Sequence, residues 1–584
     1  MKTLKYSLVV LTTICLTACD SYLEKLPLNS VTDATFFNTE SDIKQFTDGF
    51  YKDMTPRPKA ASFDFRSDLV GQNMAKSGNR DYADIQFGTI TPASKTAELY
   101  WDYGPIRNAY ILLSKIDDVD MTEEARKLYL GTTNYLLAYR YFMMFRAYEN
   151  VPIVREVLEV DNSDIPSSSK EEVFSEALTQ INKAIENLPS LSPTERERGR
   201  LTKLVALTLK ADLLLYTACR YQEAIAGATY KDAADATSAA LKEADERGYG
   251  LAENYQHLFH SSYQAGSDPQ REIIFEYVRL KDIATDMFSA WNWGPRHDDV
   301  GYGDFASTQE FIDMYLCTDG KPINKSPLYD PSRPFANRDP RLKLTTLYPG
   351  NVCSYVDGGA WVSNTLDPDE SNFDYMLSTH IQLDRSVSGY INIKYWDHQR
   401  KGGDQGYTSF IVYRYGELLL MHAEAMNEAY GPSAEVYDIL SKLRGRTGID
   451  MPPVSPDDYP TKESLRSFIR NERAVELFGE GKRYWDIRRW GVGEELMNRS
   501  FYSMHISKFN KDGSFAGYMD KIYVRTDVND ETKVELFEIP DGAKGGILMH
   551  TSIFNDKKFY VWPVPESALN KSFSGALKQH PLWE

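Results

Sequence analysis

The chain has 584 residues, with 66 basic and 84 acidic side chains and a net charge of −18 at pH 7. Because an acidic surface repels phosphate backbones, this charge excludes nucleic acid as a partner. The length allows a large hydrophobic core, and five cysteines in such a chain exclude a small scaffold that depends on disulfides.

The N-terminus has the pattern of a bacterial lipoprotein signal peptide. Lys2 and Lys5 give a positive start, residues 6–18 are mostly apolar, and Ala18 directly precedes Cys19. The apolar stretch is too short for a membrane-spanning helix. We therefore expect cleavage before Cys19 and attachment to a membrane through acyl chains on this cysteine.

The first half of the chain is predicted to be helical. Apolar residues recur at helical spacing, with few internal Gly or Pro, over residues 41–54, 101–118, 123–149, 170–188, 201–219 and 232–247. Residues 201–216 are apolar almost all round, which predicts a helix inside a stack. Such paired helices indicate a tetratricopeptide-like superhelix, although the strict repeat consensus is absent.

A loop-rich region follows, at about residues 250–410, with short β-prone segments at 272–278 and 389–395. Loops of this kind usually carry ligand contacts, so we expect this insertion to form the ligand face. Helical periodicity returns in the C-terminal part, about residues 411–584, over 413–428, 434–446 and 462–490, and a short strand is predicted at 559–563.

The later helices complete the earlier stack. We therefore predict one interleaved domain from residue 19 to 584, whose N-terminal helical part is about residues 40–250. Three cysteines remain in the folded part of the chain. A bridge between Cys317 and Cys353 is an open alternative, whereas Cys219 is expected to be a small buried hydrophobe.

Residues 471–491, NERAVELFGEGKRYWDIRRWG, resemble the signature helix of the SusD/RagB family of outer-membrane lipoproteins. Three further segments are similar to the same family, at residues 139–152, 414–425 and 559–565. The resemblance implies four tetratricopeptide-like hairpins, displayed on the cell surface at the outer membrane and seated on a SusC-like TonB-dependent transporter. It implies capture of oligosaccharides, or in some members of peptides, and no catalysis.

Charged residues of the signature recur at helical spacings, so that opposite charges can meet on neighbouring turns: Glu472, Arg473, Glu476, Glu480, Arg483 and Asp486. We interpret them as structural ion pairs. A paired arginine keeps a carboxylate ionised, which makes it unsuitable as a catalytic acid.

The strongest binding candidate is the segment that contains Trp291, Asn292, Trp293 and Arg296, followed by Tyr302. If residues 291–293 are extended, both indoles lie on one side, about 7 Å apart, close to the repeat of neighbouring sugars. Sugar C–H groups can stack on the rings, and the polar side chains can bind hydroxyls. The alternative is a hydrophobic plug under a loop.

Weaker candidates precede this segment. Trp101 stands where the family resemblance places an aromatic residue that faces the glycan, and the loop before it carries Asp68 and Arg80. The alternatives are a packing role for Trp101 at a helix entry and a solvated Asp68–Arg80 pair of little energetic value.

No metal or catalytic motif is complete. The pair His257 and His260 lacks a third ligand, and the acidic residues at 367–370 lack the glycine of a calcium loop, so a structural calcium ion has no support. We predict a glycan-binding protein that is no enzyme and has no cofactor. A peptide-binding member of the family, a surface glycoside hydrolase and an assembly scaffold without ligand stay as alternatives.

Overall fold

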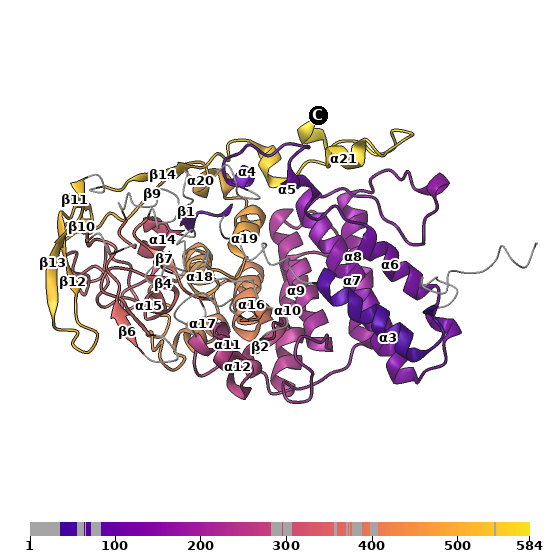
Figure 1. Cartoon of the computed structure of the whole chain (residues 1–584), viewed down its shortest axis with the longest axis horizontal. Helices are drawn as coiled ribbons and strands as arrows, with labels where there is room; N and C mark the ends of the chain where they lie inside the picture. Colours follow the sequence, from indigo (N-terminus) through magenta and orange to yellow (C-terminus); the bar gives the residue numbers. More distant parts are fainter. Residues whose placement is uncertain are drawn as a thin grey trace, which may run out of the picture.

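The computed structural model describes residues 36–54, 64, 66–71, 83–281, 295, 306–354, 359–369, 372, 374–376, 388–396, 407–541 and 545–584. Within these ranges the fold is mostly helical, and the long helices lie side by side in one stack (Figure 1). Most strands gather at the opposite end of the long axis. The molecule therefore has a helical end and an end rich in loops and short strands.

The first part of the stack is built from helices that pack against their neighbours in the chain. They are α3 (Glu40–Asp48), α6 (Gly104–Leu113), α7 (Glu123–Tyr148), α8 (Lys170–Asn187), α9 (Lys203–Arg220) and α10 (Tyr230–Glu246). Side chains of Thr122, Ser169 and Thr229 accept hydrogen bonds from backbone amides at the starts of α7, α8 and α10. The six predicted helical segments are confirmed, although the first two are shorter than expected.

The C-terminal helices join the same stack. They are α16 (Tyr415–Tyr430), α17 (Ala434–Arg444), α18 (Lys462–Glu476) and α19 (Arg483–Trp490). Helix α16 packs against α10 and α9, and α19 also packs against α9. Helix α9 thus has neighbours on several sides, which confirms that residues 201–216 form an interior helix.

Shorter helices connect these elements: α4 (Ala83–Gln86), α5 (Lys95–Glu98), α11 (Ser261–Gln264), α12 (Ser267–Glu272), α14 (Gln309–Met314), α15 (Arg341–Thr345), α20 (Gly493–Leu496) and α21 (Glu566–Leu569). Single 3₁₀ turns are η1 (Gly49–Asp53), η4 (Ile116–Asp118), η5 (Val160–Asn162), η6 (Gln256–Phe259), η8 (Lys557–Tyr560) and η9 (Pro581–Trp583). None of the helices in the described ranges is both long and apolar enough to span a lipid bilayer.

The described strands form antiparallel pairs. The pairs are β1 (Val70–Gly71) with β3 (Ala306–Ser307), β2 (Ile273–Tyr277) with β8 (Phe410–Arg414), β4 (Thr346–Leu347) with β7 (Ile391–Asn392), β5 (Val352–Ser354) with β6 (Ala360–Val362), β9 (Ser500–Tyr502) with β14 (Leu548–Thr551), β10 (Ser507–Phe509) with β11 (Phe515–Tyr518), and β12 (Lys521–Arg525) with β13 (Val534–Glu538). The strand predicted at 389–395 is therefore only two residues long.

The helix predicted over 462–490 is interrupted. It ends at Glu476 and restarts at Arg483, because Gly479 and Gly481 adopt φ values of +76° and +75°. The Asp64 carboxylate lies over this break and accepts hydrogen bonds from the amides of Gly479 (2.7 Å), Gly481 (3.3 Å) and Arg483 (3.1 Å). A residue about 420 positions earlier thus caps the start of α19.

The strand predicted at 559–563 is wrong. The chain forms the 3₁₀ turn η8 and then runs extended without a strand partner. The Trp562 amide donates to the Ala147 carbonyl at 2.7 Å, but Pro563 and Pro565 have no amide hydrogen with which to continue a ladder.

The signature charges are structural pairs, as expected, but their partners differ from the prediction. Glu476 accepts from Arg414 (2.8 Å), Arg446 (3.0 Å) and Arg341 (2.8 Å), all outside its own helix. The pair that does form on neighbouring turns of the signature is Arg489 with Asp486, and Arg489 is not among the six charges that were expected to pair there. Most of the network joins separate elements, because the arginine partners of Glu476 come from α15, from the end of β8 and from the segment after α17.

The cysteines that the structure describes, Cys219, Cys317 and Cys353, are unbonded thiols. The Cys317–Cys353 bridge is therefore wrong: Cys317 pairs through its backbone with Arg338, whereas Cys353 lies in β5 opposite Trp361. Cys219 is buried, and its Sγ donates to the Arg489 carbonyl at 3.2 Å, which confirms its expected interior position.

Candidate ligand-binding site

The β1–β3 pair brings together two parts of the chain, one just before the first candidate binding segment and one just after the second. Gly71 pairs with Ala306, and the Thr308 amide donates to the Leu69 carbonyl at 3.0 Å. Segment 72–82 begins directly after β1, and segment 296–305 ends directly before β3. Two segments that are more than 200 residues apart in sequence are therefore joined to one small sheet.

Most of the sequence-predicted site residues lie outside the described residues. They are Arg80, Trp291, Asn292, Trp293, Arg296, Tyr302 and the lipidation residue Cys19. Their roles stay predictions. Trp101 and Asp68 lie within the described part of the chain, and the structure places them in different surroundings.

Asp68 forms a buried ion pair. Its two carboxylate oxygens accept hydrogen bonds from Arg483 Nε (2.9 Å) and Nη2 (2.7 Å), and the residue is only 4% exposed. The alternative of a solvated pair is therefore wrong for Asp68. Both oxygens hold the start of α19, so a contact with a ligand would compete with this pair, and that contact stays a prediction.

Trp101 is half-buried at an open pocket of about 530 Å³. Its ring meets Tyr148 edge to face at 5.0 Å and Tyr103 at 6.1 Å. The Tyr103 hydroxyl donates to the Pro152 carbonyl at 2.8 Å, which fixes the wall behind the indole. The ring thus packs at the entry of α6, as the alternative interpretation proposed, and also lines a hollow large enough for a small ligand.

The pocket combines this aromatic wall with hydrogen-bonding side chains. Asp102, Arg107, Glu156, Asp164 and Lys571 line it, and they come from the start of α6, the 152–165 segment and the C-terminal segment after α21. Asp164 accepts from Ser572 Oγ at 2.6 Å, and this bond lowers the pKa of the carboxyl below its usual value. Sequence reasoning missed these polar residues, because the segments that carry them are some 400 positions apart.

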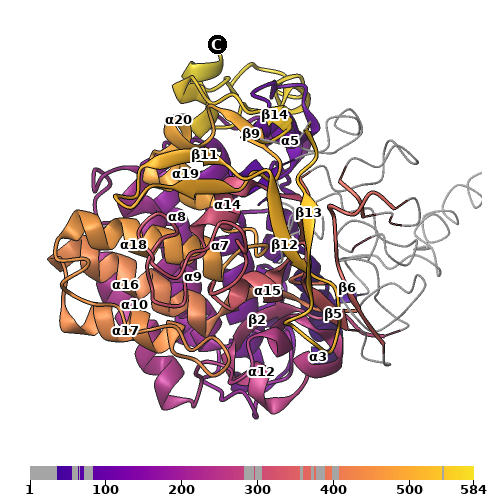
Figure 2. The ribbon, with the colours of Figure 1, turned by 90° about the vertical axis from the view of Figure 1, so that its left-hand side faces the viewer.

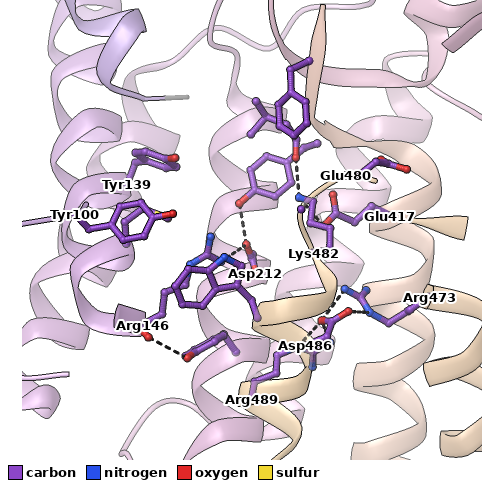
Figure 3. A pocket seen from close by; sticks show the side chains of 17 residues that line it. Tyr100, Tyr139, Arg146, Asp212, Glu417, Arg473, Glu480, Lys482, Asp486 and Arg489 are labelled. Carbon is purple, nitrogen blue, oxygen red and sulfur yellow. Dashed lines mark hydrogen bonds and ion pairs between the residues drawn. The ribbon is translucent and has the colours of Figure 1, made fainter. Parts of the chain in front are cut away.

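A second, narrower cavity lies between the two parts of the helical stack (Figure 3). Its volume is about 60 Å³, enough for a few water molecules and too small for a sugar. Lys482 pairs with Glu417 at 2.8 Å, and Asp212 accepts from the Tyr413 hydroxyl at 2.9 Å. The cavity is therefore an internal polar site and not the ligand site.

Burial is the main influence on the chemistry of that cavity. It raises the pKa of Glu417 above its usual value, and the nearby Lys482 only partly opposes this effect. Figure 3 shows Arg473 and Arg489 converging on Asp486, with hydrogen bonds of 2.9 Å from each. These groups join α18 and α19 to the core.

The paired histidines have packing and capping roles. His257 stacks on Tyr263 with ring centres 4.2 Å apart, and the His260 side chain accepts from the Ser262 amide at 3.3 Å. In the ranges that the structure describes, no group of three or more His, Cys, Asp or Glu side chains is arranged to hold a metal ion.

Comparison with known proteins decides the family. The model of the SusD family matches residues 271–583, which is more than half of the chain, and a model described as starch-binding, associating with outer membrane, matches residues 21–213. The chain belongs to the SusD family. The resemblance of residues 471–491 is thus confirmed.

Relatives of this SusD-family chain extend over most of its length. SusD-like protein P38 of Formosa agariphila is 24% identical over 503 residues, which cover 84% of this chain and 92% of that protein. The crystal structure of a SusD-like carbohydrate-binding protein from Bacteroides fragilis has a TM-score of 0.73 and 23% identity, covering 92% of this chain and 99% of that one. A laminarin-binding SusD-like protein has a TM-score of 0.57 and 19% identity, covering 93% and 99%. These likenesses confirm the predicted mostly helical, tetratricopeptide-like fold.

Proposed function

We propose that this SusD-family protein is a lipid-anchored, surface-exposed glycan-binding protein of the outer membrane that delivers oligosaccharide to a SusC-like TonB-dependent transporter. Support comes from the family, from the outer-membrane association in the description matching residues 21–213, and from a structural neighbour described as carbohydrate-binding. The observation that carries the proposal is Trp101, which lines an open pocket with polar side chains around it.

The pocket suits a sugar for a specific physical reason. A pyranose ring has faces of weakly positive C–H groups, which an indole attracts, and a rim of hydroxyls, which carboxylates and cationic side chains bind. Trp101 supplies the indole, while Asp164, Arg107 and Lys571 supply the rim contacts. Binding at a shallow site of this kind displaces water for only a modest gain in free energy. We therefore expect dissociation constants from micromolar to millimolar, which correspond to binding free energies of about −8 to −4 kcal/mol.

The loop residues complete the proposal. Trp291 and Trp293 would stack on further sugars, Asn292, Arg296 and Tyr302 would bind hydroxyls, and Arg80 and Asp68 would contribute from the neighbouring loop. Cys19 would carry the lipid. These residues lie outside the described part of the chain, except for Asp68. The protein acts in this proposal by binding, and it leaves the glycan chemically unchanged.

Affinity electrophoresis in native gels that contain single polysaccharides tests the proposal. A soluble form that starts after Cys19 is expected to be retarded by at least one neutral glycan. Trp101→Ala should weaken this retention about tenfold, equivalent to about 1.4 kcal/mol, because the stacking surface is lost. Trp291→Ala and Trp293→Ala are expected to weaken it in the same way.

Tyr430→Ala is the matched control, since Tyr430 is 57% exposed and does not line the Trp101 pocket. This variant should migrate as the wild type does. Melting temperatures of all variants show that folding is intact. Unchanged retention of the Trp101 variant would remove this pocket from the site, and new reducing ends in the incubated glycan would contradict the absence of catalysis.

A further inference from the structure

A second groove lies at the end of the molecule opposite the helices α3 and α6. It runs between segment 323–331 and the turn of the β10–β11 hairpin, residues 509–513, and has a volume of about 520 Å³. Figure 1 places β10 and β11 at the left end of the long axis, and in Figure 2 β11 faces the viewer. The groove is separate from the Trp101 pocket, because the two have no lining residue in common.

The groove has a firmly held aromatic wall. Tyr329 and Phe509 lie with ring centres 6.0 Å apart, and the Tyr329 hydroxyl donates to the Ser507 carbonyl at 3.2 Å. The backbone of Gly513 comes so close to the Asn324 carbonyl that a Cβ there would lie 2.6 Å from it. Because the two walls touch at this point, the groove is preformed, which lowers the entropic cost of binding.

The charge of the groove contrasts with that of the whole chain. The residues that line the groove include two lysines, Lys325 and Lys511, and one aspartate, Asp512, whereas the chain as a whole has a net charge of −18. Lys325 and Lys511 both line the groove, and neither makes an ion pair with any residue that the structure describes. Asp512 accepts hydrogen bonds from the amide and the hydroxyl of Ser514 at 2.9 and 2.6 Å.

More aromatic surface continues along the same hairpin. Phe515 and Tyr518 of β11 are 55% and 39% exposed, and their ring centres are 4.9 Å apart. Exposed rings of this size add little to the core, and a cluster of them on a monomer marks an interaction surface. The amides of Asn324 and Asn510 line the groove beside the lysines.

From these features we infer that the groove between segment 323–331 and the β10–β11 turn is a second carbohydrate site, which takes an anionic glycan. Tyr329 and Phe509 offer stacking surface to the sugar rings, and Lys325 and Lys511 pair with carboxylate or sulfate groups on them. Charge complementarity favours an acidic sugar over a neutral one, since two ammonium groups without an ion pair in the described part of the chain bind carboxylate or sulfate more strongly than hydroxyls. The inference builds on the proposed glycan-binding function and adds a substrate class.

Calorimetry with defined glycans tests the inference. The probes are polygalacturonate, the same polymer after reduction of its carboxyl groups, and κ-carrageenan as the sulfated chain. The wild type is expected to bind at least one of the two acidic chains, and Lys325→Ala/Lys511→Ala should weaken that binding at least tenfold. Raising the salt from 50 to 300 mM should weaken it as well, because the contacts are exposed charges.

Lys127→Ala/Lys231→Ala is the control, because it removes two exposed helical lysines and changes the net charge equally. Binding of polygalacturonate alone identifies the carboxylate as the recognised group, and binding of carrageenan alone identifies the sulfate. The inference is overturned if neither acidic chain binds, if the carboxyl-reduced polymer binds as tightly as its acidic parent, or if the groove variant behaves like the control.

The same measurements separate this inference from the proposed function. Only the inference fails if neutral glycans bind, Trp101→Ala weakens their binding, and Lys325→Ala/Lys511→Ala leaves the binding of acidic chains unchanged. If the wild type binds no glycan, neutral or acidic, the proposed function fails too.

Discussion

At the scale of single residues, His550 in β14 has an unusual position. It is buried, it stacks on Phe501 at 4.9 Å, and neither ring nitrogen has a hydrogen-bond partner among the described residues. Burial lowers the pKa of His550 to about 4, because the apolar surroundings disfavour the charged ring. The folded state therefore binds a proton at this site less readily than the unfolded chain does.

This pKa predicts an acid-dependent loss of stability. The contribution of neutral His550 is fully present above the ordinary pKa of 6.5 and is lost as the pH falls toward 4. Between pH 7 and 5 the free energy of unfolding should fall by about 2 kcal/mol through this residue. Urea unfolding of His550→Phe should show a correspondingly flatter pH profile, whereas an unchanged profile would contradict the assignment.

At the scale of elements, the break between α18 and α19 decides the geometry of the signature segment. The turn at residues 477–482 places α19 against α9 and brings Asp486 within 2.9 Å of Arg473 on α18. An uninterrupted helix would carry these two side chains apart. The glycines at the turn therefore have a structural role that the charges alone do not reveal.

Substitution at the turn should show this requirement. Gly481 has a φ of +75°, and a side chain there is strained, so Gly481→Ala is expected to lower the free energy of unfolding by about 1 kcal/mol or more. Gly49→Ala is the control, because Gly49 has a φ of −62° and open space where a Cβ would lie. Chemical denaturation of the two variants should therefore give opposite or clearly unequal changes in the free energy of unfolding. Equal changes in this free energy would argue against strain at the turn.

At the scale of the whole molecule, a buried ion network connects distant parts of the chain. Glu476 of α18 meets Arg414 at the end of β8, Arg446 after α17 and Arg341 of α15. Glu272 of α12 also pairs with Arg414 at 2.8 Å. Because these groups are buried, each has lost its hydration. Attraction to its ion-pair partners compensates for that loss.

Removing the central carboxylate should therefore be costly. Glu476→Gln leaves three buried arginines short of a negative partner, and we expect the free energy of unfolding to fall by about 3–5 kcal/mol. Glu531→Gln, at an exposed position, is the control and should change little. A loss below about 1 kcal/mol in Glu476→Gln would show that the network contributes less than its burial suggests.

The same carboxylate predicts a pH effect. Burial by itself raises the pKa of Glu476, but Arg446, Arg414 and Arg341 outweigh it and hold the pKa well below its usual 4.5. The stabilisation is present above about pH 4.5 and is lost as the pH falls further. In Glu476→Gln the acid-induced fall in the free energy of unfolding below this pH should be smaller than in the wild type.

The sequence alone was sufficient for most of the long helices and for the family. Apolar periodicity identified the helical segments, since the burial of one helical face leaves a local pattern, and residues 471–491 carried the family resemblance. The structural role of the signature charges was also predictable, because opposite charges that recur at helical spacing indicate ion pairs.

Only the tertiary structure decided which partners meet. The Asp68–Arg483 pair, the cap that Asp64 forms on α19, the Trp101 pocket and the Lys325–Lys511 groove all join segments that are distant in sequence. No local sequence pattern indicates such pairings, because the paired residues are far apart in the chain and meet only when the separate elements pack together. The sequence therefore determines which segments are helical, whereas packing determines which polar groups become buried pairs and which remain open to a ligand.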